Sequence, residues 1–112
     1  MENRFEISML IDYYGTLLTE KQFNVMTLYY NEDLSLAEIA EINKTSRQAI
    51  YDLIKRCSKQ LHSYDEKLKL SKKVDKRYRI KEELMAELNK NSNLDEDIKN
   101  YIDEKLEEII NA

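Results

Sequence analysis

Proline is absent from this sequence of 112 residues, and glycine occurs only once, as Gly15. β-Sandwiches and β-barrels need turn residues at intervals of about 8–12 positions, which this chain lacks. Phosphate-binding P-loops and dinucleotide-binding loops need several glycines, so both are excluded. The composition therefore predicts an all-α fold. The length predicts one compact domain, or a small domain with an appendage.

Cysteine is almost absent as well, since Cys57 is the only one. A single cysteine excludes an intrachain disulfide and a cysteine-based zinc cluster, and we expect Cys57 to be a core residue. The first six residues lack the charged-then-apolar layout of a signal peptide. No apolar run approaches the roughly 18 residues that a membrane span needs. We expect a soluble, cytoplasmic protein without membrane insertion.

Catalytic and metal-binding signals are weak. The single histidine, His62, precedes Asp65 and Glu66 by three and four positions, so the three side chains could share one helix face. One imidazole with two carboxylates is not a specific metal signature. No nucleophile can be paired with a general base. We predict that the protein is not an enzyme and uses no catalytic residue, metal or cofactor.

Charge is distributed in three blocks, although the net charge is only −4. Residues 1–43 carry two basic and eight acidic side chains, residues 44–81 carry thirteen basic and four acidic ones, and residues 82–112 carry three basic and ten acidic ones. The basic middle block could attract phosphates by releasing condensed counterions. It could equally be a solvated helix face, or it could neutralise the acidic tail within the fold.

An N-terminal helix is predicted by apolar residues at helical spacing, and Gly15 sits where a C-terminal cap would end it. Capping boxes at Thr19–Gln22 and Ser35–Glu38 predict two more helices, over about residues 20–30 and 36–42. The predicted inner faces of the three helices consist of Phe5, Met9, Leu10 and Tyr13, then Phe23, Met26 or Thr27, and Tyr30, then Leu36, Ile39 and Ala40.

A turn at Asn43-Lys44 leads to a long helix capped by Thr45 or Ser46. Its apolar residues follow a seven-residue rhythm that fades after about three heptads. This predicted seam consists of Ile50, Ile54, Cys57, Leu61, Tyr64 and Leu68. We expect either the acidic last helix or a second chain to cover it.

A weaker apolar stripe continues over residues 74–88 and predicts a further helical stretch. Lys90-Asn91-Ser92-Asn93 is a predicted turn, and Asn93 is the predicted cap of a last helix. The inner face of that helix is predicted to hold Ile98, Tyr101, Ile102, Leu106, Ile109 and Ile110.

Residues 35–57 spell a helix-turn-helix, because a short capped helix, a tight turn and a second capped helix follow one another. Small Ala40 allows the two helices to cross closely, while Ile39, Ile50 and Leu53 supply the shared core. The outward face of the second helix would then consist of Ser46, Arg47, Gln48, Tyr51, Asp52 and Lys55. A recognition helix places such a face in the major groove of DNA.

The outward residue types suit nucleic acid. Arg47 can donate a forked pair of hydrogen bonds to guanine, and Gln48 can pair with adenine. Tyr51 could stack on an unpaired base or pack against a neighbouring helix. The predicted nucleic-acid-binding residues are Lys44, Ser46, Arg47, Gln48, Tyr51, Lys55, Arg56 and Lys59, with Lys44, Lys55, Arg56 and Lys59 assigned to phosphates. The alternative is an αα-hairpin that merely packs inside a helical bundle.

Two families resemble this sequence. Ser35-Leu36-Ala37-Glu38-Ile39-Ala40 followed by Thr45-Ser46-Arg47-Gln48-Ala49-Ile50-Tyr51 resembles the helix-turn-helix of sigma factor region four. Leu17-Leu18-Thr19-Glu20-Lys21-Gln22, Tyr29-Tyr30 and Tyr64-Asp65-Glu66-Lys67-Leu68 resemble the YlxM-like family of small bacterial proteins, over about residues 5–70. That resemblance implies an all-helical, dimeric protein that acts in or regulates the signal recognition particle pathway.

We therefore predict a helix-turn-helix domain of winged-helix or sigma region four type over residues 1–62, and a helical tail over residues 63–112 that makes a homodimer. The predicted function is DNA binding with a regulatory role tied to the signal recognition particle. Two alternatives stay open. The basic stretch 44–81 could bind structured RNA, or the motif could have become a protein-docking surface that binds particle components.

Overall fold

The computed structural model describes residues 3–91 and 93–112, which contain six α-helices, one short 3-10 helix and no strand. The predicted all-α fold is therefore confirmed. The elements in chain order are α1 (Arg4–Tyr14), η1 (Gly15–Leu17), α2 (Glu20–Tyr30), α3 (Leu36–Ile42), α4 (Arg47–Leu68), α5 (Leu70–Asn89) and α6 (Glu96–Asn111). The chain divides into two compact units, the first ending at Ser71 and the second beginning at Lys72. α4 thus continues beyond residue 62, where the sequence had suggested a boundary.

The helix starts follow from local capping chemistry. Both predicted capping boxes are present: Thr19 with Gln22 at the start of α2, and Ser35 with Glu38 at the start of α3. In each box the hydroxyl accepts from a backbone N–H while the longer side chain accepts from the backbone N–H of the cap. Ser46, rather than Thr45, caps α4, because its hydroxyl accepts from the Ala49 N–H at 3.1 Å.

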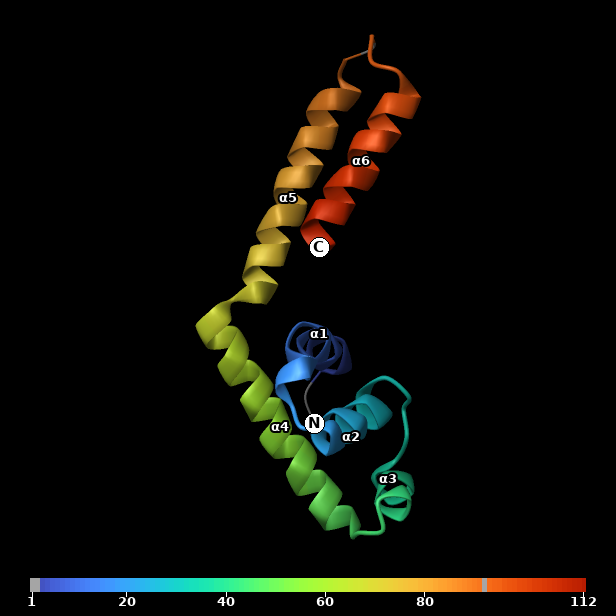
Figure 1. Ribbon diagram of the computed structural model, residues 1–112, viewed down its shortest axis with the longest axis vertical. Coiled ribbons are helices and arrows are strands. Elements are labelled where there is room, and N and C mark those ends of the chain that lie inside the picture. Colours follow the sequence, from blue (N-terminus) through green and yellow to red (C-terminus); the bar gives the residue numbers. More distant parts are fainter. Residues whose placement is uncertain (1–2, 92) are drawn as a thin grey trace. The chain divides into compact units, whose positions relative to one another are not determined.

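The core of the first unit lies along α4, and Figure 1 shows the three preceding helices gathered beside it. The predicted seam is buried at Ile50, Ile54, Cys57 and Leu61. Tyr64 is half-buried, whereas the expectation for Leu68 is wrong, since it is 48% exposed. Within the first unit, α1, α2 and α3 of the same chain cover this buried part of the seam, so the expectation that the last helix or a second chain covers it is wrong.

The inner face of α1 differs from the prediction. Phe5 is 73% exposed, and Met9 and Tyr13 are only half-buried. The helix instead buries Ile7, Leu10, Ile11 and Tyr14. Apolar residues occupy two overlapping helical stripes in this segment, and packing against α4 selects the one that contains Ile7 and Tyr14.

Gly15 is the C-cap of α1, as the sequence predicted, and its backbone N–H donates to the Ile11 carbonyl. Its φ of −56° is right-handed, so no special backbone conformation requires glycine there. A Cβ at this position would lie 2.8 Å from Cε2 of Phe23. The absence of a side chain at Gly15 therefore leaves room for the Phe23 ring. Phe23 was expected on the inner face of α2 but is 41% exposed, and Val25, Met26 and Tyr30 form the buried face.

α4 ends without the help of glycine or proline. Lys69 adopts a left-handed conformation with φ 58° and donates its N–H to the Asp65 carbonyl. The Asp65 carboxylate accepts the Tyr14 hydroxyl at 2.6 Å, the Ser71 hydroxyl at 2.5 Å and the Ser71 N–H at 3.2 Å. The Leu70 N–H donates to the Tyr14 hydroxyl oxygen. These bonds cap the first turn of α5 from α1 and α4, and we call Tyr14, Asp65 and Ser71 the junction triad.

The second unit is a hairpin of α5 and α6 (Figure 1). The predicted turn is present at Lys90 and Asn91, while Ser92 lies outside the described residues. Asp95 caps α6 through a bond from the Asp97 N–H, so the assignment of the cap to Asn93 is wrong. Asp95 directly precedes the first residue of α6, and its carboxylate supplies the acceptor.

A single partner helix covers only part of each hairpin helix. No residue of α5 is buried, and all of α5 belongs to the described chain. On α6, Ile102, Leu106 and Ile110 are half-buried as the sequence suggested. The expectation is wrong for the three others, Ile98, Tyr101 and Ile109, which are 49%, 60% and 71% exposed. Among the described residues, no helix is long and apolar enough to cross a membrane.

Candidate nucleic-acid interface

A tight turn brings α3 and α4 together. Ile39, Ala40 and Ile50 are buried where the two helices pack, and Leu53 contacts the same core, as predicted. The side-chain amide of Asn43 donates to the Ile39 carbonyl at 2.9 Å, and the Thr45 N–H donates to the Ala40 carbonyl. These bonds saturate carbonyls at the end of α3. The helix-turn-helix predicted from residues 35–57 is present.

The turn includes Lys44, which has a φ of 53°. Residues other than glycine and asparagine seldom adopt this left-handed conformation. The surrounding hydrogen bonds hold Lys44 in place, and its side chain is exposed. Its ammonium is therefore available to an anion beside the start of α4.

The start of α4 is chemically suited to acceptor atoms. A helix leaves its first N–H groups without a helical partner, and its dipole makes that end positive. Ser46 accepts from the Ala49 N–H, and the first turn of α4, which is fully described, has no acidic residue. By contrast, Glu38 occupies the first turn of α3 and accepts from the Ser35 backbone N–H, which lowers the pKa of its carboxyl.

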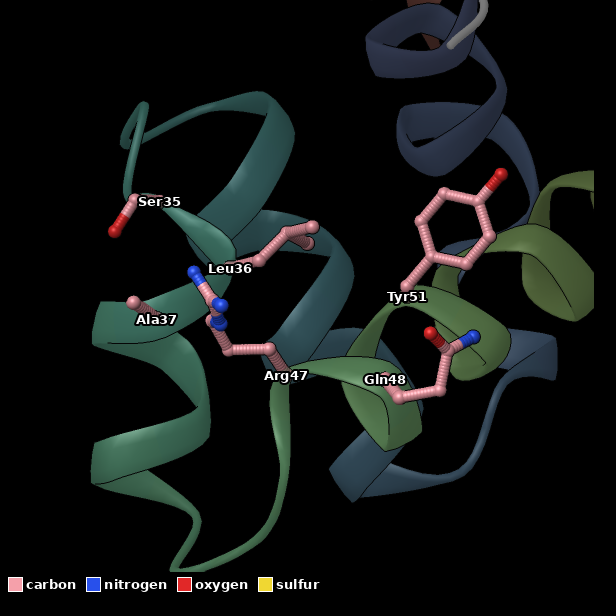
Figure 2. Close-up of a pocket in the computed structure, with 6 residues that line it drawn as sticks. All are labelled: Ser35, Leu36, Ala37, Arg47, Gln48 and Tyr51. Atoms are coloured by element: carbon pink, nitrogen blue, oxygen red, sulfur yellow. The ribbon is translucent and has the colours of Figure 1, made fainter.

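A shallow hollow of about 640 Å³ lies between the two helices. Figure 2 shows Arg47 extending across it toward α3, while Gln48 and Tyr51 project from the next positions of α4. Its walls are formed by Ser35, Leu36 and Ala37 at the start of α3 and by Arg47, Gln48 and Tyr51 of α4. Ala37 and Arg47 are both exposed to solvent.

Asp52 orients one of the predicted base-reading residues. The Gln48 amide nitrogen donates to the Asp52 carboxylate at 3.0 Å, one helical turn away. An amide nitrogen carries two hydrogens, so Gln48 keeps one donor and its oxygen acceptor for a ligand. The sequence placed Asp52 on the outward face but not among the predicted nucleic-acid-binding residues, and the structure gives it this positioning contact.

The next turns of α4 carry cations. Asp52, Lys55, Arg56 and Lys59 line a second hollow of about 290 Å³. The three cations are exposed, and the Lys55 ammonium lies 5.7 Å from the centroid of the Tyr51 ring. The predicted residues thus fall into two groups: Arg47, Gln48 and Tyr51 at the first hollow, and Lys55, Arg56 and Lys59 at the second.

Sequence reasoning missed the α3 side of the first hollow. Ser35 was assigned to helix capping and Leu36 to packing, and Ala37 received no role. The capping box predicts where α3 begins, but their place at the hollow depends on how α3 crosses α4, which no local signal specifies. Lys44 and Ser46 lie in the turn and at the cap.

Other reactive groups are engaged in packing. Burial raises the pKa of the Cys57 thiol, which lies in the core as expected. His62 has its Nδ1 atom 3.9 Å from a Glu6 oxygen, and Asp65 belongs to the junction triad. Among the described residues, no group of three histidine, cysteine, aspartate or glutamate side chains could hold a metal ion.

Comparisons with known proteins give a consistent result. Residues 1–101 match the family model described as "UPF0122: Putative helix-turn-helix protein, YlxM / p13 like". A UPF0122 protein of Clostridium perfringens (strain SM101 / Type A) is 99% identical over 112 residues, which is all of both chains. A UPF0122 protein of Clostridium novyi (strain NT) is 51% identical over 106 residues, covering 93% of this chain and 92% of that one.

Proposed function

The chain belongs to the UPF0122 family of YlxM/p13-like helix-turn-helix proteins, and from that premise we propose that it is a DNA-binding regulatory protein. The first turns of α4 act as the recognition element in the major groove, where base edges differ in their donors and acceptors. Such a role places the protein in the cytoplasm with the DNA.

One observation carries the proposal: the exposed start of α4 presents Arg47 and Gln48 together, with free donors and no acid in its first turn. Lys55, Arg56 and Lys59 follow on the next turns and suit backbone phosphates. Base-reading side chains at the helix start, with cations farther along, are the arrangement that a recognition helix uses.

The Arg47→Ala/Gln48→Ala variant tests this proposal. We expect it to lose discrimination between the preferred DNA sequence and random duplex by about 30-fold or more, because it removes two base contacts that each contribute roughly 1–3 kcal/mol of discrimination. Selection from a random duplex library identifies the preferred sequence, and competition binding measures the discrimination.

A matched control is Lys21→Ala/Asn24→Ala, which removes one cation and one amide from exposed positions of α2. The control variant should retain the discrimination of the unaltered protein. If the Arg47/Gln48 variant retains it as well, α4 is not the reading element and the motif is a protein-docking surface instead.

We also propose that the hairpin of α5 and α6 forms a homodimer. Its apolar residues line a groove of about 180 Å³ along the two helices, with Ile80, Leu84, Leu106, Ile109 and Ile110 among its walls. Ile80 and Ile109 are more than half exposed. Two such hairpins, placed face to face, would bury these residues as a four-helix bundle does.

The Ile80→Ser/Ile109→Ser variant is expected to be monomeric in sedimentation velocity at concentrations where the unaltered chain is a dimer. A Phe5→Ser variant removes an equally exposed apolar side chain from the first unit and should leave the dimer intact. An unaltered chain that is already monomeric would contradict the proposal.

The resemblance to YlxM-like proteins further supports a proposed regulatory role in the signal recognition particle pathway. The net charge of −4 would also permit an adaptor that binds protein components of the particle without reading DNA. Co-purification of particle proteins with the Arg47/Gln48 variant would support the adaptor, since that contact would not need the DNA-reading residues.

A further inference from the structure

The first two turns of α5 carry an unusual density of positive charge. Lys72, Lys73, Lys76 and Arg77 are all exposed, and Asp75 is the one acid among them. We call these four cations the α5 basic surface. The sequence left three possibilities for them: an anion-binding role, a solvated helix face, or neutralisation of the acidic tail.

The acidic helix α6 neutralises a different part of α5. The Lys81 ammonium lies 2.5 Å from Glu107 and 3.2 Å from Asp103, and these contacts raise the pKa of Lys81. Asn111, the last residue of α6, donates through its side chain to the Tyr78 hydroxyl. The side-chain hydrogen bonds and ion pairs that these α6 residues make with α5 therefore involve Tyr78 and Lys81.

The α5 basic surface lies before Tyr78 in the chain. None of its four cations forms an ion pair with a carboxylate of residues 3–91 or 93–112. Unlike Lys81, whose side chain is only 12% exposed, these side chains extend into solvent. Neutralisation by the tail therefore accounts for Lys81 but not for the α5 basic surface, which leaves anion binding and a solvated helix face.

Spacing indicates the kind of ligand. Lys72 and Lys76 are one turn apart, as are Lys73 and Arg77, so the cations form two short rows, each with a step of about 6 Å along the helix. Exposed cations that do not line a binding pocket bind a single small anion weakly, because water and salt screen each ion pair. A polyanion with regularly spaced charges gains far more, since its condensed counterions are released.

We propose that the α5 basic surface is a second, sequence-independent contact with the phosphate backbone of duplex DNA. The inference extends the proposed function, because it adds backbone contacts outside the helix-turn-helix to the same class of ligand. The apolar groove that we propose for dimer formation is lined by Ile80 and Leu84 of α5 together with residues of α6. Dimer formation and backbone contact therefore use different residues of α5, except for Arg77, which also lines the groove.

The test is the salt dependence of binding to random-sequence duplex DNA, measured with the full chain. Lys72→Gln/Lys76→Gln removes two cations from the α5 basic surface. Lys90→Gln/Lys105→Gln removes two cations that pair with Glu87 and Glu108 in the same unit. Affinity falls as salt rises, and each phosphate contact contributes roughly 0.9 to the steepness of log affinity against log salt. The first variant loses two contacts, so its plot should be less steep by about 1.8, and the control should have the steepness of the unaltered chain.

Equal slopes for the unaltered chain and Lys72→Gln/Lys76→Gln would overturn the inference. A slope change seen only with duplex RNA would overturn it too, because the surface would then recognise a different nucleic acid. The proposed function can fail while this inference stands. If the Arg47/Gln48 variant keeps its discrimination between DNA sequences, α4 does not read bases. A less steep salt dependence of the Lys72→Gln/Lys76→Gln variant would still support the backbone contact. Helical circular dichroism checks that each variant is folded.

Discussion

Replacing Ile54 by alanine is expected to lower the free energy of unfolding of the first unit by about 3 kcal/mol, within the 2–5 kcal/mol typical of such truncations. Ile54 is fully buried in the middle of α4, and α1, α2 and α3 all pack against that helix. The loss combines the removed apolar surface with a cavity that the surrounding helices can only partly close.

Leu68→Ala is the matched control, because it truncates a residue at the far end of the same heptad seam. Leu68 is 48% exposed, so its truncation should cost well under about 1 kcal/mol. Urea unfolding monitored by circular dichroism measures both values. Equal losses of unfolding free energy for the two variants would contradict this account, because the cost of truncation would then depend on a position in the seam and not on burial beneath α1–α3.

Replacing Asp65 by alanine is expected to destabilise the first unit by about 2 kcal/mol. The change removes the acceptor of the Tyr14 hydroxyl, whose residue is 1% exposed, and of both Ser71 groups. A buried hydroxyl that loses its partner costs roughly 1–3 kcal/mol. Asp12→Ala, which removes an exposed aspartate of α1, should cost little, and urea unfolding compares the two.

The same carboxylate gives the stability a defined pH dependence. Burial acts to raise the pKa of Asp65, but hydrogen bonds from Ser71 and Tyr14 outweigh it, and the pKa lies below its ordinary value. A carboxyl with a lowered pKa in the folded state contributes stability above its unfolded-state pKa and loses it as pH falls through the folded value. The stability difference between the unaltered chain and Asp65→Asn should therefore shrink below about pH 4. A constant difference down to pH 2 would contradict this account.

Local chemistry explains why the starts of α2 and α3 could be predicted, whereas the cap of α6 was assigned to the wrong residue. The bounds of α2 and α3 match the predicted ones because each depends on a capping box contained within four residues. Inner faces were predicted less reliably. In α1 a stripe through Phe5 and Met9 competes with one through Ile7 and Ile11, and only packing against α4 decides between them.

Tertiary contacts explain what the sequence did not predict. The end of α4 at Lys69 depends on the junction triad, in which Tyr14 comes from a distant part of the chain. The outward face of α4 could be predicted from periodicity, and Arg47, Gln48 and Lys55 are exposed as expected. The contribution of Ala37 to the first hollow depends on how α3 crosses α4, which no local pattern specifies.

The buried thiol of Cys57 gives the protein an internal reporter of its own opening. It is the only cysteine in the chain, it lies 1% exposed between α4 and the helices that cover it, and burial raises its pKa. A thiol-reactive dye can reach it only when those helices separate, so the labelling rate measures how often the first unit opens. Bound DNA that held α3 and α4 together would slow that reaction in the unmodified protein, and a ligand held only by the second unit would leave it unchanged.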